Sequence, residues 1–129
     1  MQSQHNIATI GRERRFYPRF AAPKRALVAI PGDALGLPYN MADISEGGLS
    51  FVYIGNSSLA FKEGKLDIYL NEDLQVGMLP VTVVADSVLE GYFIPKRRCN
   101  ICFGQLNEAQ RQELRRFITR HATAVRANS

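Results

Sequence analysis

The sequence predicts a mainly β domain, an antiparallel barrel or sandwich, followed by one C-terminal amphipathic helix. From Ala26 onward, short apolar or alternating segments recur at close intervals between turn residues, the pattern of an all-β domain. The last segment instead repeats its apolar residues at helical spacing. At 129 residues, with 46% hydrophobic and 22% charged residues, the chain fits one globular domain with its own core.

The expected strands follow a short leader. Residues 1–11 are polar and aperiodic, which indicates a flexible leader before a single domain over residues 12–126. The first strand is expected at 26–30 and ends at the turn residues 31–33. Further strands are expected at 39–44, 49–54, 66–70, 79–89, 92–94 and 100–103.

Two patterns are specific enough to place side chains. Alternation over 66–70 puts Leu66, Ile68 and Leu70 on one face of a strand, and residues 71–73 then turn the chain. Near the C-terminus, Asn107 and Gln110 have the spacing of a capping box. A helix is therefore expected at about 107–125, with its apolar stripe formed by Leu114, Phe117, Ile118 and Val125.

The charge of the chain is concentrated near its start. Residues 1–25 contain six basic residues and one acidic residue, a net charge of +5, whereas the whole chain carries +4. A basic segment on a nearly neutral body indicates a local anion site rather than a surface made for a long polyanion. A solvated basic tail accounts for the same composition, so charge alone leaves both interpretations open.

The first motif in this basic segment is Arg15-Phe-Tyr-Pro-Arg19. Pro18 disfavours the helical conformation for Tyr17, so the stretch is expected to run extended or to turn sharply. Four extended residues separate the two arginines by roughly 13 Å, which suits separate parts of one ligand better than a single phosphate. A guanidinium group binds phosphate oxygens in pairs and also matches the O6 and N7 acceptors of guanine.

The second motif is Asp43-Ile-Ser45-Glu-Gly47-Gly48. In an extended strand, Asp43 and Ser45 lie on one face, where a carboxylate can accept hydrogen bonds from N1 and N2 of guanine. Gly47 and Gly48 permit positive φ angles and let the backbone approach a ligand. Because Asp, Ser and Gly are also ordinary turn residues, the motif on its own indicates no more than a β-turn.

Taken in order, the two motifs resemble those of the PilZ family, bacterial receptors for cyclic di-guanylate (cyclic di-GMP). That family has an Arg-x-x-x-Arg motif near its N-terminus and a following Asp/Asn-x-Ser-x-x-Gly motif. The resemblance extends over about residues 14–117. The matching positions are Arg15, Arg19, Asp43, Ser45 and Gly48.

The resemblance implies a six-stranded antiparallel barrel that binds cyclic di-GMP, with the arginine segment folding over the nucleotide. Arg15 and Arg19 would contact phosphates and guanine edges, and Asp43 and Ser45 would hold a guanine. Arg14 stands where some relatives have an arginine and bind two stacked nucleotides, so the number of nucleotides stays open. The receptor would signal to an unidentified effector protein, as a monomer or a homodimer.

The sequence also predicts several absences. There is no pattern of a secretory signal, and the uncharged runs, such as residues 74–85, are too short for a membrane span, so a cytoplasmic protein without a membrane partner is expected. Cys99 and Cys102 form a lone Cys-x-x-Cys without further ligands at suitable spacing, and no metal, redox or cofactor role is expected. No catalytic constellation is recognisable, so an enzyme is not expected.

Two other functions remain open. One is a protein-interaction adaptor of the same fold that binds no nucleotide. The other is a small basic barrel for RNA or single-stranded DNA, because Phe16, Tyr17 and Phe20 lie among the arginines. The remainder of the chain is nearly neutral and offers little positive surface to bind a long polyanion, so no DNA or RNA partner is expected.

Overall fold

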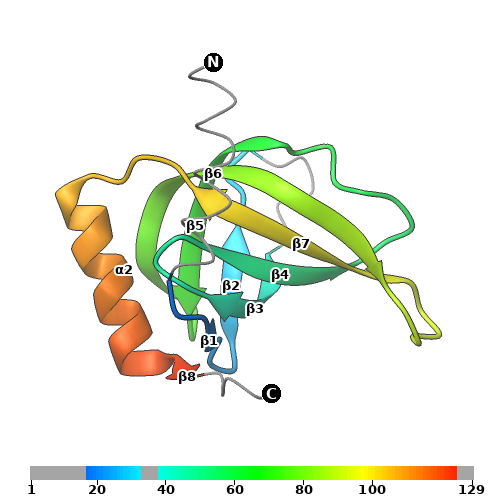
Figure 1. The fold of residues 1–129 in the computed structure, drawn as a ribbon, viewed down its shortest axis with the longest axis horizontal. Helices are drawn as coiled ribbons and strands as arrows, with labels where there is room; N and C mark the ends of the chain where they lie inside the picture. Colours follow the sequence, from blue (N-terminus) through cyan, green and yellow to red (C-terminus); the bar gives the residue numbers. More distant parts are fainter. Residues whose placement is uncertain (1–16, 33–37, 125–129) are drawn as a thin grey trace.

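The computed structural model describes residues 17–32 and 38–124 and has eight strands and one helix within these ranges (Figure 1). The predicted leader lies outside the described residues, as do Arg14 and Arg15. The strands are β1 (Phe20–Ala21), β2 (Ala26–Ala29), β3 (Tyr39–Ile44), β4 (Gly48–Ile54), β5 (Glu63–Leu70), β6 (Asp73–Leu89), β7 (Lys96–Phe103) and β8 (Thr123–Ala124). The helix is α2 (Glu108–His121).

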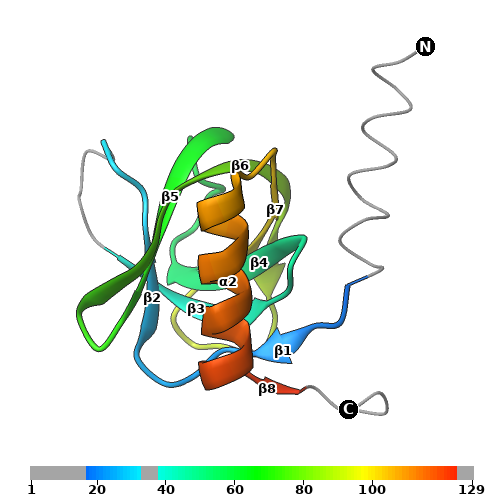
Figure 2. The same ribbon diagram turned by 90° about the vertical axis from the view of Figure 1, so that its left-hand side faces the viewer.

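Six of the strands close into an antiparallel barrel, as predicted. The strand order is β2-β5-β6-β7-β4-β3-β1-β8, and an additional pairing between β2 and β3 closes the first six strands of this series. The short strands β1 and β8 continue from β3 outside the closed barrel. Figure 2 shows α2 lying along the barrel, with β1 and β8 beside its C-terminal end. The N-terminal and C-terminal segments of the domain are thus joined through a two-stranded extension.

Alternating residues fill the barrel. On β5, Leu66, Ile68 and Leu70 are buried on one face, which confirms the predicted alternation. The turn that follows is also confirmed, since Asn71 and Glu72 adopt positive φ angles of 52° and 72° between β5 and β6. A two-residue turn with positive φ at both positions matches the right-handed twist of the two antiparallel strands that it joins. The largest fully buried side chains include Phe51, Phe117, Ile44, Leu49, Leu66, Ile68, Leu79 and Ile101.

The helix begins as its sequence predicts and ends earlier. The backbone amide of Gln110 donates to Oδ1 of Asn107 at 2.7 Å, and the Asn107 amide donates to Oε1 of Gln110 at 3.1 Å. This confirms the capping box, and Leu114, Phe117 and Ile118 are buried against the barrel. The predicted end at residue 125 is wrong, because Ala122 is extended and the chain enters β8 to pair with β1. Val125 lies outside the described residues.

The predicted strand at 92–94 is wrong. These residues lie in the connection between β6 and β7, where Gly91 has a φ of 89° and the chain reverses. Their side chains have high β propensity, but propensity cannot show where a hairpin turns. The neighbouring strands are longer than predicted: β6 starts at Asp73 and β7 at Lys96.

The described helix is too short and too polar to cross a membrane.

Candidate functional site

A carboxylate held between two arginines lies on the outer face of the barrel. Arg19 Nη2 donates to Oδ2 of Asp43 at 2.5 Å, and Arg98 Nη2 donates to the same oxygen at 2.5 Å. Arg98 also donates to Oγ of Ser50 at 3.0 Å. The Arg19 and Arg98 side chains are 50% and 35% exposed, whereas that of Asp43 is 10% exposed. The arginines therefore present their remaining donors to solvent above a nearly buried anion.

The backbone explains why Asp43 faces outward. Met41 and Ile44 both belong to the core although they are three residues apart on β3, and the pairing with β4 shifts register between Met41 and Asp43. Such a bulge turns one extra residue out of the regular alternation. Asp43 pairs with Ser50 of β4, and β1 crosses beside it through the pairing of Ala21 with Asp43. With β7, which carries Arg98, four strands thus bring the cluster together.

Ser45 lies in a tight turn just after β3. Its amide donates to the Gly48 carbonyl at 2.8 Å, and its hydroxyl donates to the same carbonyl at 3.3 Å. The Gly47 amide donates to Oγ of Ser45 at 3.1 Å. Ser45 is fully buried, so its hydroxyl shapes the turn. The expected shared strand face with Asp43 is not found, because β3 ends at Ile44.

Gly48 is required by strand packing. A Cβ atom at this position would lie 2.1 Å from the Ile101 carbonyl oxygen on β7, far inside van der Waals contact. Neither Gly47 nor Gly48 has a positive φ, so the conformational freedom that glycine permits is not used here. The Gly47 carbonyl accepts a hydrogen bond from the Phe103 amide at 2.9 Å. The two glycines hold the turn tightly against β7.

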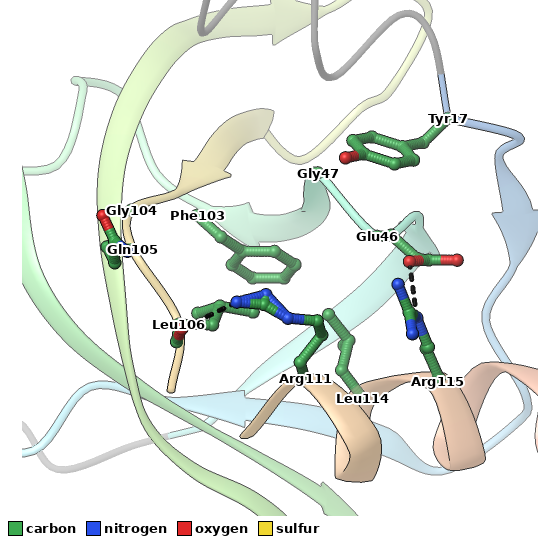
Figure 3. Close-up of a pocket in the computed structure, with 10 residues that line it drawn as sticks. All are labelled: Tyr17, Glu46, Gly47, Phe103, Gly104, Gln105, Leu106, Arg111, Leu114 and Arg115. Carbon is green, nitrogen blue, oxygen red and sulfur yellow. Dashed lines mark hydrogen bonds and ion pairs between the residues drawn. The ribbon is translucent and has the colours of Figure 1, made fainter. Parts of the chain in front are cut away.

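A cavity of about 200 Å³ lies between this turn and α2 (Figure 3). Glu46 on the turn accepts from Nε of Arg115 on the helix at 2.9 Å, and this hydrogen bond raises the pKa of Arg115. Arg111 donates to the Leu106 carbonyl at 3.1 Å at the other side of the cavity. The lining residues are Tyr17, Glu46, Gly47, Phe103, Gly104, Gln105, Leu106, Arg111, Leu114 and Arg115.

The structure brings together part of the predicted site. Arg19 and Asp43 are in contact, and the turn formed by Ser45, Gly47 and Gly48 follows directly, with Gly47 opening onto the cavity. Sequence reasoning missed Arg98, whose contact with Asp43 spans 55 residues. Alternation along β7 places Arg98 on the outer face, but only the pairing of strands shows which residue it meets.

The two cysteines are buried strand residues. Cys99 and Cys102 both lie on β7 with little exposure. Burial raises the pKa of the Cys99 thiol to about 12, which disfavours the thiolate that metal binding and redox chemistry use. Within residues 17–32 and 38–124, no group of three or more His, Cys, Asp or Glu residues is placed to hold a metal ion.

Solved structures share this fold. The PilZ domain of YcgR from Escherichia coli, solved with c-di-GMP, has a TM-score of 0.64 at 17% identity, over 82% of this chain and 89% of that one. The MrkH–c-di-GMP complex of K. pneumonia has a TM-score of 0.64 at 16% identity, over 82% of this chain and 51% of MrkH. MotI/DgrA, the Bacillus subtilis inhibitor of motility, has a TM-score of 0.53 at 19% identity, over 84% and 53%. The chain thus spans about half the length of MrkH and MotI.

At these identities the structural likeness shows the fold alone. No curated protein matches the chain in sequence. A family model described as the PilZ domain matches residues 13–120. This match includes both motifs, every described strand except β8 and nearly all of α2. The chain therefore belongs to the PilZ domain family.

Proposed function

We propose that this chain is a receptor for cyclic di-GMP and that its site is centred on Asp43. The observation that carries the proposal is the cluster of Arg19, Asp43 and Arg98 on the outer face of the barrel. Family membership supports it, as do the YcgR and MrkH structures with c-di-GMP, which have the same fold. The ligand is a dianion with two guanines, and the cluster offers groups for both parts.

The arginines supply the recognition of charge. Arg19 is half exposed, and a guanidinium group has five N–H donors, so the contact with Asp43 leaves donors for phosphate oxygens or for O6 and N7 of guanine. Arg15 is proposed to act in the same way, four residues earlier. Arg14 is proposed to assist if a second nucleotide stacks on the first. Phosphate contacts by two or three arginines compensate the charge of the ligand.

The carboxylate of Asp43 is proposed to recognise the guanine base. Asp43 is proposed to accept from N1 and N2 of one guanine, an edge that phosphate-binding groups cannot read. Arg98 holds this carboxylate from the β7 side, and the Ser50 hydroxyl accepts a second hydrogen bond from the same arginine. Ser45, Gly47 and Gly48 are proposed to act through the turn that ends β3, by fixing the backbone next to the guanine.

Ligand binding is proposed to dock the basic N-terminal segment against the barrel. Before binding, the like charges of Arg12, Arg14, Arg15 and Arg19 oppose close packing of this segment, and the dianion removes that repulsion. The docked segment together with β1 then forms the surface that an effector protein recognises. Hydrogen exchange of residues 10–22 tests this step: saturating cyclic di-GMP slows it if docking occurs, and unchanged exchange would contradict docking.

Isothermal titration of the full chain with cyclic di-GMP tests the proposal. Micromolar affinity is expected, and the titration gives the number of nucleotides bound directly. GMP is the matched control, because it has one guanine and one phosphate but cannot span the separated arginines. No heat with cyclic di-GMP would instead favour a nucleotide-independent adaptor. A steeply salt-dependent affinity for oligonucleotides would favour a nucleic-acid-binding barrel.

A further inference from the structure

The connection between β6 and β7 exposes an unusual amount of apolar surface. Tyr92, Phe93 and Ile94, which we call the hairpin tip, are 55%, 102% and 54% exposed. Ile54 at the end of β4 is 69% exposed, and its pairing with Lys96 places it at the base of the tip. The β6–β7 hairpin projects from the barrel on the side away from α2 (Figure 1). Clusters of exposed aromatic and aliphatic side chains mark interaction surfaces on proteins.

The base of the hairpin is firmly braced. Asp86 on β6 accepts from the Tyr53 hydroxyl at 2.6 and 2.8 Å, from the Leu59 amide at 3.0 Å and from Arg97 Nε at 2.9 Å. Burial opposes the ionisation of Asp86, but these hydrogen bonds outweigh it and lower its pKa. Burial and the hydrogen bond to Asp86 raise the pKa of Tyr53, which therefore stays a neutral donor. The network joins β4, β6, β7 and the segment that contains Leu59.

Two contacts extend this order to the tip. The Gly55 amide donates to the Pro95 carbonyl at 3.1 Å. The Lys96 ammonium group lies 4.6 Å from the centre of the Tyr92 ring, within the range of a cation–π contact. Apolar side chains on a braced support lose little conformational entropy on association.

A groove adjoins the tip, and it is lined by Asn40, Tyr53, Ser57 and Ser58 as well as by apolar residues. It encloses about 540 Å³, and its apolar walls are formed by Pro38, Tyr39, Val52, Ile54, Leu59 and Ala60. Ile54 is shared between the groove and the base of the tip, and Gly55, which bonds to Pro95, also lines it. The chain thus presents a projecting aromatic side chain and an apolar hollow next to each other.

The charge of this region narrows the kind of partner. Residues 86–97 carry Asp86, Glu90, Lys96 and Arg97, which sum to zero, and Asp86 and Arg97 are bonded to each other. An anionic membrane or a nucleic acid would need a basic rim around the tip. A protein partner whose surface is neutral and apolar, with a hollow and a projecting side chain of its own, fits this region better than a membrane or a nucleic acid does.

We propose that the partner is a second copy of this chain, with the hairpin tip of each copy seated in the groove of the other. A knob and a hollow that lie side by side are self-complementary, so a two-fold axis between them satisfies both at once and closes the assembly at a dimer. Phe93 is the central contact. The contact uses neither Asp43 nor the basic segment and therefore does not depend on the proposed nucleotide.

Sedimentation equilibrium of the full chain across the micromolar range tests this dimer. The wild-type chain is expected to dimerise reversibly, and Phe93→Ser is expected to weaken the dimer at least roughly tenfold. Ala60→Arg, on the groove side, should do the same. Leu74→Ser is the matched control: it removes a side chain that is 57% exposed, on the part of β6 far from the tip, and should leave dimerisation unchanged. Circular dichroism checks that every variant is folded.

Several outcomes would overturn the proposal. They are a wild-type chain that stays monomeric throughout the range, a dimer that Phe93→Ser leaves intact, and open-ended oligomers in place of a dimer. A chain that stays monomeric but co-sediments with phosphatidylglycerol-containing vesicles would assign the tip to a membrane and also overturn it.

Discussion

Arg98 and Asp43 are 55 residues apart in the sequence and are joined on the outer face of the barrel by a hydrogen bond of 2.5 Å. The same guanidinium nitrogen donates to Ser50 at 3.0 Å. Arg98 thus links β7 to β4 and β3, while Arg19 reaches the carboxylate from the other side. Asp43 is held in one orientation by one arginine 24 residues before it and another 55 residues after it. This relationship makes Arg98 part of the proposed site.

Replacing Arg98 with alanine is expected to weaken cyclic di-GMP binding by roughly tenfold to a hundredfold, since a hydrogen bond to a charged group contributes about 1.5 to 3 kcal/mol. The loss arises because Asp43 is no longer fixed from the β7 side. Calorimetric titration measures it, and circular dichroism checks the fold. Arg116→Ala, on an exposed position of α2, is the control for loss of one positive charge. Equal affinities for the two variants would remove Arg98 from the site.

Gly48→Ala is expected to lower the free energy of unfolding by about 3 kcal/mol, at the upper end of the cost of overpacking, because the new methyl group meets a backbone oxygen. That oxygen belongs to Ile101 and would be 2.1 Å away. Gly55→Ala is the control, because its Cβ meets nothing closer than 3.5 Å. Urea denaturation of both variants gives the comparison. Similar midpoints would show that β4 and β7 can separate at this point without cost.

The Asp86 network predicts a dependence of stability on pH. The pKa of Asp86 is lowered on folding, so its charged form adds to the free energy of unfolding. This contribution is complete above the unfolded-state pKa of 3.8 and is lost as the pH falls through the lower folded-state pKa. Asp86→Asn is expected to cost about 3 kcal/mol near neutral pH, since it leaves Arg97 without its charged partner.

Urea midpoints measured from neutral pH down to acid test this linkage. The difference between wild type and Asp86→Asn should stay constant above about pH 5 and shrink below about pH 4, as expected for a carboxylate with a lowered pKa. Asp67→Asn changes a different carboxylate, one that accepts from the Met78 amide on an exposed part of the sheet, and is the control. A difference for Asp86→Asn that is independent of pH would show that its charge does not stabilise the fold.

Local patterns predicted the elements whose signals are themselves local. The capping box at Asn107 and the alternation from Leu66 to Leu70 depend on residues within one turn or one strand, and both were confirmed. The strands β1 and β8 were not predicted, because each has only two residues and is defined by its pairing, β1 with β3 and β8, and β8 with β1. The misplaced strand at 92–94 has the same cause: its side chains favour a strand, but the tertiary hairpin turns there.

The candidate site was predictable only in part for a similar reason. The motif residues Arg19 and Asp43 could be identified from spacing and resemblance, and the structure places them in contact. Ser45 kept the conformation of an ordinary turn, and Gly48 is explained by its neighbour Ile101. The close approach of Gly48 to Ile101 cannot be seen in the sequence, because it depends on the pairing of β4 with β7. Arg98 illustrates the limit, because its partner is fixed by register alone.

The central claim is that Arg15, Arg19 and Asp43 form a cyclic di-GMP site, and calorimetric titration of Arg15→Ala/Arg19→Ala beside the wild type tests it most directly. Loss of both arginines should cost about 3 to 6 kcal/mol and move micromolar binding to roughly millimolar, in a chain that still folds. Lys24→Ala/Lys65→Ala removes the same charge from exposed positions and should bind like wild type. Undiminished affinity in the double arginine variant would contradict the account.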